Sequence, residues 1–259
     1  MALRITDEYR SMLPQLRYHP TPKRVRAKVG GATVVDSTSA RLVWEPRRVV
    51  PQYAVPVADV DATPTEAKGD SLAENPVQMI EARVLDPSTG FAAHSCPGQA
   101  FTLTAGEREL SDAAFAPADP DLAGYLLLDF AAFDQWLEED EEVVGHPRDP
   151  RSRIDIRSSS RHVVLEVDGT VVADSRRPMM LFETFLPVRY YLPPEDVRTD
   201  LLQPSDKRST CAYKGHATYF SVVIDGSVTP DLAWTYQHPL EDARRIANLI
   251  AFFDERVDV

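Results

Sequence analysis

Residues 31–37 of this chain read GATVVDS, and residues 169–175 read GTVVADS, a near-repeat whose starts are 138 positions apart (169 minus 31). The similarity continues downstream, where LVWE at 42–45 returns as MLFE at 180–183. Residues 123–134 likewise resemble residues 247–258. Self-similarity at a fixed offset over roughly 35 residues indicates an internal duplication. We therefore predict a tandem pair of similar domains.

The local patterns of the second copy predict antiparallel sheet. The apolar residues 163, 165 and 167 alternate with Val164, Glu166 and Asp168, and Asp168-Gly169 is a typical hairpin turn. Residues 189–192 and 219–224 have the aromatic and β-branched composition of further strands. The apolar spacing after Pro239 predicts a helix from Glu241 to about Phe253. We expect a mainly β fold of two antiparallel-sheet domains, each with one helix near its C-terminal end.

The composition shifts suggest domain boundaries. We expect an N-terminal extension at 1–22, a first repeat domain at 23–134, an acidic and proline-containing junction at 135–159, and a second repeat domain at 160–259. The acidic run in the junction is interpreted as a solvated helix end, because Glu139, Asp140 and His146 lack a recognisable metal-ligand spacing. The polar residues 61–75 are predicted to form a mobile loop.

Composition and charge exclude several classes of protein. The 28 basic against 40 acidic residues give a net charge of -12, which opposes binding to nucleic acid or anionic lipid, although an arginine cluster at 148–161 is an alternative. No apolar run approaches the ~18 residues of a membrane span. Two cysteines cannot form a disulfide framework, and the first ten residues lack an apolar signal region. A cytoplasmic location is expected.

The second copy contains the most distinctive motifs. Glu183, YYLP at 190–193, TCAYKG at 210–215, YF at 219–220 and AWTY at 233–236 occur in an order that resembles the bacterial family known as domain of unknown function 427. The resemblance covers nearly all of residues 160–259 and, more loosely, residues 23–134. It implies a β-tent, or Mss4-like, fold. The family label also implies nucleotidyl transfer, without an established reaction.

Relatives of the implied fold hold zinc through paired Cys-x-x-Cys motifs or bind heterocycles in an aromatic cage. Cys96 and Cys211 are isolated and the histidines are not at ligand spacing, so we predict no metal and no cofactor. An aromatic binding site stays open, because aromatic rings offer flat apolar faces to a planar ligand. The alternative for each ring is ordinary core packing.

Residues 210–216, TCAYKGH, form the densest group of reactive side chains. Lys214 could hold an anion or act as a nucleophile, Cys211 beside it could have a lowered pKa, and Gly215 would allow close backbone approach. Glu183 could pair with Lys214 or accept a ligand N–H group. The structural alternatives are an inert thiol, a surface lysine and a strand-end carboxylate. In the first copy, HSCPG at 94–98 is the matching segment and lacks the tyrosine and the lysine.

We therefore predict a small-molecule-binding protein whose second domain takes a planar, nucleotide-like ligand. The alternative is a non-enzymatic protein-interaction module. The sequence predicts no reaction class, because the chain has no phosphate-binding glycine loop, GxSxG motif or paired-carboxylate metal motif. Whether it catalyses a reaction stays open. Ligand identity and oligomeric state are not specified by the sequence. The predicted ligand-binding residues are Glu183, Tyr190, Tyr191, Cys211, Tyr213, Lys214, Gly215, Tyr219 and Trp234.

Overall fold

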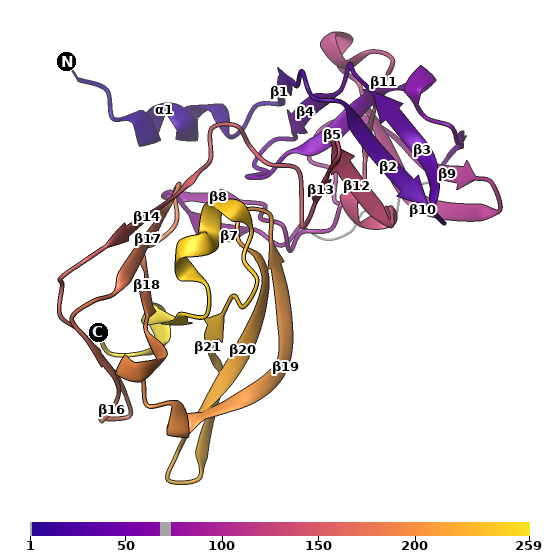
Figure 1. Cartoon of the computed structure of the whole chain (residues 1–259). Coiled ribbons are helices and arrows are strands. Elements are labelled where there is room, and N and C mark those ends of the chain that lie inside the picture. The colour runs from indigo at the N-terminus through magenta and orange to yellow at the C-terminus, as the bar shows by residue number, and fades with distance from the viewer. Residues whose placement is uncertain (1, 68–73) are drawn as a thin grey trace. The chain divides into compact units, whose positions relative to one another are not determined.

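The computed structural model describes residues 2–67 and 74–259 (Figure 1). The chain divides into two compact units, Met1–Asp149 and Pro150–Val259. Both units are built mainly from antiparallel β-strands, as predicted. Among the described residues, no helix is long and apolar enough to cross a membrane.

The first unit begins with a short α-helix, α1 (Ile5–Met12), inside the segment that we expected to be an extension. Three 3-10 helices lie between its strands: η1 (Val57–Asp59), η2 (Pro120–Leu122) and η3 (Phe130–Ala132). Its strands are β1 (Arg17–Pro20), β2 (Val25–Val29), β3 (Ala32–Ser37), β4 (Arg41–Trp44), β5 (Gln52–Pro56), β6 (Thr63–Glu66), β7 (Val77–Met79), β8 (Ala82–Val84), β9 (Gly98–Ala105), β10 (Arg108–Pro117), β11 (Tyr125–Leu128), β12 (Gln135–Glu138) and β13 (Glu141–Val143).

These strands form a seven-stranded sheet in the order β1-β4-β5-β11-β10-β9-β6, a four-stranded sheet in the order β13-β12-β2-β3, and a two-stranded sheet of β7 and β8. Successive side chains of a strand point to opposite faces, so the large sheet buries a separate cluster on each side. Tyr53 packs in the cluster that includes β2, β3 and Trp136, whereas its neighbour Ala54 packs with Phe115 in the other cluster. The large sheet is therefore covered on both faces.

The second unit uses the same plan. Its strands are β14 (Ile154–Ser158), β15 (Val163–Val167), β16 (Thr170–Ser175), β17 (Met179–Glu183), β18 (Arg189–Leu192), β19 (Leu202–Cys211), β20 (Gly215–Ile224), β21 (Ser227–Thr235) and β22 (Ile250–Phe252). The 3-10 helices are η4 (Pro194–Asp196), η5 (Thr199–Leu201), η6 (Glu241–Ile246) and η7 (Asp254–Arg256). The order β14-β17-β18-β22-β21-β20-β19 repeats the order of the first large sheet, strand for strand. Figure 1 shows β19, β20 and β21 as long adjacent strands.

The hairpins that open each copy confirm the duplication. Gly30 and Gly31 turn the chain between β2 and β3, and Asp168 and Gly169 do so between β15 and β16. All these turn residues have positive φ, at 59° and 82° in the first unit and 49° and 75° in the second. Positive φ at both central positions is the geometry of the tight hairpin turn that matches strand twist. Gly31 and Gly169 thus occupy equivalent turns.

A matching β-bulge aligns the later strands of the two copies. The register shifts at Asp112 in β10 and at Asp231 in β21, whose φ angles are 50° and 52°. The N–H groups of both residues donate to a hydroxyl on the neighbouring strand, Thr102 or Ser221, at 3.2 Å in each case. This common feature fixes which residues of the two units correspond.

The predicted helix from Glu241 to about Phe253 is wrong. The chain instead forms the short η6 (Glu241–Ile246), turns at Asn248 with φ of 60°, and continues as β22. Of the apolar residues that suggested one helical face, Ile246 ends η6, Ile250 begins β22, and Leu249 and Phe253 lie outside both elements. All three residues of β22 are buried because the strand lies between β18 and β21. Asn tolerates the left-handed conformation that separates η6 from the strand.

Two other segments differ from the sequence-based expectation. Residues 135–159 are not a junction: β12 and β13 complete the four-stranded sheet of the first unit, and β14 is the edge strand of the second large sheet. The acidic run therefore lies on a hairpin between β12 and β13 and not at a helix end. Within the predicted loop 61–75, β6 pairs with β9, and residues 68–73 lie outside the described residues.

Candidate functional site

The structure brings Glu183 and Lys214 into contact. Glu183 ends β17, and Lys214 lies in the short connection between β19 and β20. The Lys214 Nζ donates to Glu183 Oε2 in an ion pair whose side chains are 12% and 15% exposed. A carboxylate can accept about four hydrogen bonds, and Lys214 supplies one of them. The two charges are therefore largely withdrawn from water and neutralise each other, while both side chains still reach the surface.

Aromatic side chains lie near this ion pair. Tyr191 in β18 is 1% exposed, and its hydroxyl accepts a hydrogen bond from Trp234 Nε1 at 3.2 Å. The two rings meet edge to face with centroids 6.2 Å apart. Burial is the main reason that the pKa of Tyr191 is raised, and the charge of Glu183 raises it further. Tyr191 is therefore a neutral phenol and not a general base at physiological pH.

Tyr219 belongs to the same aromatic group, but its hydroxyl is hydrogen-bonded to a residue of the neighbouring strand. Its hydroxyl lies 2.8 Å from Ser209 Oγ on the adjacent β19. Its ring centroid is 6.4 Å from that of Trp234 and 4.8 Å from the Lys207 Nζ. Tyr219 and Trp234 are 8% and 7% exposed, so both rings are mainly part of the core.

The connection that carries Lys214 is anchored through its backbone. The Tyr213 N–H donates to Cys211 Sγ at 3.5 Å, and the Lys214 carbonyl accepts from the Leu240 N–H at 3.1 Å. Gly215 has φ of 92°, a backbone conformation that residues other than glycine rarely adopt. Cys211, Tyr213 and Lys214 are all half-buried. Gly215 thus shapes the connection that presents Lys214 to Glu183.

Tyr190 does not join this group. It packs against the cluster formed with β15 and β16, whereas Tyr191 belongs to the cluster on the other face of the sheet. The reason is the two-residue period of a strand, which sends adjacent side chains to opposite faces. Its counterpart in the first unit, Tyr53, stacks on Trp136 with centroids 5.0 Å apart. Tyr190 is therefore partly buried against the core on the opposite face of the sheet from Tyr191.

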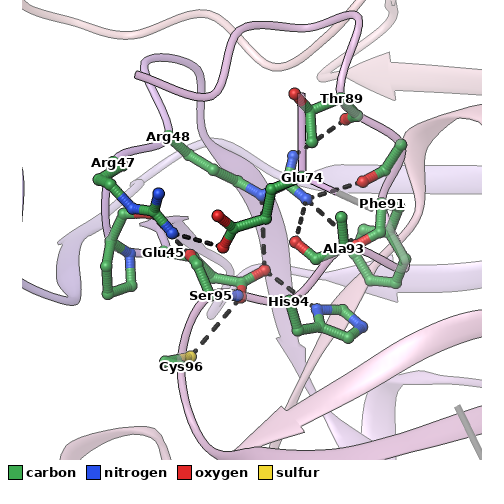
Figure 2. Close-up of polar contacts among 12 residues, drawn as sticks. Glu45, Arg47, Arg48, Glu74, Thr89, Phe91, Ala93, His94, Ser95 and Cys96 are labelled. Atoms are coloured by element: carbon green, nitrogen blue, oxygen red, sulfur yellow. Dashed lines mark hydrogen bonds and ion pairs between the residues drawn. The ribbon is translucent and has the colours of Figure 1, made fainter. Parts of the chain in front are cut away.

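The first unit contains a corresponding carboxylate in a closed environment (Figure 2). Glu45 follows β4 and is 0% exposed. Its Oε2 accepts from the Ser95 N–H at 2.8 Å and from Cys96 Sγ at 3.6 Å, and its Oε1 lies 3.1 Å from His94 Nδ1. Burial and the nearby Glu45 charge raise the pKa of Cys96 to about 12, so this cysteine is a protonated thiol.

Arg48 completes the closed site of the first unit, and Figure 2 shows its guanidinium among backbone carbonyls. The side chain is 2% exposed, and its Nε lies 3.7 Å from Glu45 Oε1. Its two terminal nitrogens donate to the carbonyl oxygens of Thr89, Gly90, Phe91 and Ala93 at 2.8–3.2 Å. Burial lowers the pKa of Arg48, and Glu45 opposes that change. Arg48 thus holds the 89–93 segment against the sheet.

The bulge register corrects our alignment of the two copies around this carboxylate. Ala100 pairs with Phe115 in the first unit, and Tyr219 pairs with Trp234 in the second. Counting back five residues from Ala100 and from Tyr219, past the start of β9 and of β20, places Ser95 at the position of Lys214. The sequence comparison had matched the glycines instead. Both residues donate to the equivalent carboxylate, one through its backbone and one through its side chain.

The sequence analysis did not predict that Arg48 and His94 contact Glu45. They follow different elements, and a string of charged residues does not show which member is buried. The signal was the EPRR segment at 45–48, where a carboxylate and an arginine are three residues apart. No group of three or more His, Cys, Asp and Glu side chains in the described part of the chain could hold a metal ion.

The raised pKa of Asp254, which follows β22, predicts that the stability of the fold depends on pH. Burial raises its pKa to about 6, against the attraction of Arg189 at 3.9 Å. Because the folded state then binds this proton more tightly than the unfolded state, stability should rise by about 1 kcal/mol as pH falls from 7 to 5. We expect urea unfolding to show this rise in the wild type and to lose it in Asp254→Asn, with exposed Asp206→Asn as the control. Parallel pH profiles for wild type and Asp254→Asn would contradict it.

Comparison with known sequences supports the resemblance of the second copy. A family model described as a domain of unknown function, DUF427, matches residues 17–73 and 155–259. The matched segments include Glu45 of the first unit and Glu183 of the second. A search of curated proteins found no match. Because the matched segments make up more than half of the chain, with one in each of two units of the same strand order, the chain belongs to the DUF427 family.

Proposed function

We propose that the second unit binds a small planar molecule at the Glu183–Lys214 pair. The observation that carries the proposal is an ion pair that is mostly buried but still reaches the surface, at 15% and 12% exposure, next to a group of aromatic rings. Charges in such a setting are costly to withdraw from water, and recessed polar groups beside apolar surface are typical of ligand sites.

The duplication supports assigning this role to the second unit. The corresponding Glu45 is fully buried, and its carboxylate already accepts hydrogen bonds from other residues of the first unit. Residues 67–97 separate β6 from β9, whereas residues 212–214 alone separate β19 from β20. The longer connection supplies His94, Ser95 and Cys96. The first unit therefore has a closed version of the carboxylate site, with a structural role.

We propose binding and not nucleotidyl transfer. That reaction needs carboxylates that hold a divalent metal ion near the phosphates. The described residues contain no group of three or more His, Cys, Asp and Glu side chains that could hold a metal ion, and the neutral Tyr191 does not supply a base. Protein interaction is the second candidate, because Phe182 and Leu186, which flank Glu183, are 39% and 43% exposed.

A ligand screen distinguishes the two candidates. Nucleosides, nucleotides and small heterocycles that bind the folded chain should raise its melting temperature, since binding stabilises by RT ln(1 + [L]/Kd). Calorimetric titration of a hit should then show a loss of about 1.5–3 kcal/mol in Lys214→Met, the value of a hydrogen bond to a charged group. Lys23→Met, which removes an ion-paired lysine of the first unit, is the matched control.

The contradicting results are equally specific. If Lys214→Met and Lys23→Met bind the hit with the affinity of the wild type, the ligand lies elsewhere. If no compound in the screen changes the melting temperature, small-molecule binding is wrong, and the exposed Phe182 and Leu186 become the better guide to function.

A further inference from the structure

The Glu183–Lys214 pair has no net charge, and this limits which ligands can bind there. The Lys214 ammonium already faces a carboxylate, and both side chains are mostly buried. A phosphate or carboxylate group that approached Lys214 would also approach Glu183. Repulsion and attraction would nearly cancel, with little water present to screen either one. The pair is therefore poorly suited to an isolated anion.

The first unit shows which groups a carboxylate at this position accepts. Glu45 receives a hydrogen bond from the Ser95 N–H at 2.8 Å. It also lies 3.1 Å from Nδ1 of the His94 imidazole, and since a carboxylate only accepts, Nδ1 is the donor. That imidazole stacks on Phe115 with centroids 3.6 Å apart and an interplanar angle of 11°. A planar ring with an N–H group thus meets this carboxylate over an aromatic side chain.

The residues that correspond to this arrangement are present in the second unit. Glu183 takes the place of Glu45, and Trp234 takes the place of Phe115 in the bulge register. The main differences are Tyr213, which the same count places at the position of His94, and Lys214, an ammonium donor where the first unit has the backbone N–H of Ser95. The second unit therefore offers an acceptor and a donor side by side.

We infer that the ligand presents the neutral edge of a nitrogen heterocycle, with an N–H group toward Glu183 and an adjacent oxygen or nitrogen acceptor toward Lys214. This inference rests on the proposed function and specifies its ligand class. An edge of this kind keeps both buried charges hydrogen-bonded when it enters between them, whereas an anion would leave Glu183 unpaired. Purine bases have such edges, so a base and not a phosphate would be recognised at this pair.

Titration calorimetry on the full chain tests the inference with matched probes. The pairs are inosine with 1-methylinosine and adenosine with N6,N6-dimethyladenosine, in which methylation removes the N–H donor. We expect methylation to weaken binding of at least one parent nucleoside by about 10- to 100-fold, the loss of a hydrogen bond to a charged group. Inosine monophosphate should bind within about threefold of inosine. Inorganic phosphate should not bind.

One variant, compared with a matched control, reports on Glu183 directly. Glu183→Gln should reduce the preference for the unmethylated nucleoside and, by removing the opposing charge, allow inorganic phosphate to reach Lys214. Glu138→Gln, which changes the ion-paired carboxylate of Lys23 in the first unit, should alter neither property. This control keeps the overall change in charge the same.

The results separate this inference from the proposed function. Equal binding of methylated and unmethylated nucleosides, or binding of inorganic phosphate to the wild type, would overturn the inference. If Lys214→Met still weakened binding in that case, the proposed function would stand. If none of the nucleosides, nucleotides or heterocycles bound, both would fail.

Discussion

Replacing Arg48 by methionine is expected to destabilise the first unit by about 3–5 kcal/mol, the cost of removing one partner from a buried charge pair. Arg48 is 2% exposed, and the Glu45 that faces it is 0% exposed. Methionine keeps much of the apolar stem but leaves this carboxylate without its arginine. It also leaves four backbone carbonyls of residues 89–93 without the guanidinium.

Arg47→Met is the matched control, because it makes the same substitution one residue away. Arg47 pairs with Glu74, and both side chains are 36% exposed. Exposed pairs of this kind contribute about 0–1 kcal/mol. Urea unfolding of the two variants should therefore differ by several kcal/mol, and hydrogen exchange should locate the loss in residues 85–97. Similar stabilities for both variants would contradict the buried-pair account.

Replacing Trp136 by alanine is expected to cost about 3–5 kcal/mol, as for other large-to-small changes of buried aromatic residues. Trp136 in β12 is 1% exposed and stacks on Tyr53 and Phe130 with centroids 5.0 and 5.5 Å away. Its Nε1 also donates to the Phe130 carbonyl at 2.9 Å. The alanine variant would lose the ring contacts and leave that carbonyl unpaired.

This substitution also tests where the first unit ends. If residues 135–138 were a connecting segment outside the unit, the loss of a side chain there would change stability by less than about 0.5 kcal/mol. Glu142→Ala, on the neighbouring β13, provides the control, because Glu142 is exposed. Urea unfolding should show a large loss for Trp136→Ala and almost none for Glu142→Ala. Equal effects would restore the interpretation of this segment as a junction.

Patterns that depend on neighbours along the chain were predictable from the sequence. The hairpin at 163–175 follows from two-residue alternation and an Asp-Gly turn, and the structure confirms both. The duplication follows in the same way, because each copy repeats its turn residues. The contact between Glu183 and Lys214 was one of three alternatives offered for Glu183, and it rested on family motifs and not on spacing.

Features that depend on distant contacts could not be predicted. The apolar spacing of residues 246–253 fits a helix as well as a 3-10 turn followed by a buried strand, and pairing with β18 and β21 decides between them. Glu45 and Arg48 look like surface charges until the 89–93 segment folds over them. Tyr190 and Tyr191 are adjacent in a motif, but the face that each one occupies depends on which sides of the sheet are covered.

The central claim is that a small planar ligand binds at Glu183 and Lys214 in the second unit. The chain has three tryptophans, Trp44 and Trp136 in the first unit and Trp234 in the second, whose indole N–H groups report separately on the two units. The most direct test is a ¹H–¹⁵N NMR titration of the labelled full chain with the tightest nucleoside from the screen. We expect the Trp234 indole signal, next to Tyr191, to shift with ligand concentration, while the signals of Trp44 and Trp136 stay in place. Shifts confined to Trp44 or Trp136, or no saturable shift of Trp234, would contradict the account.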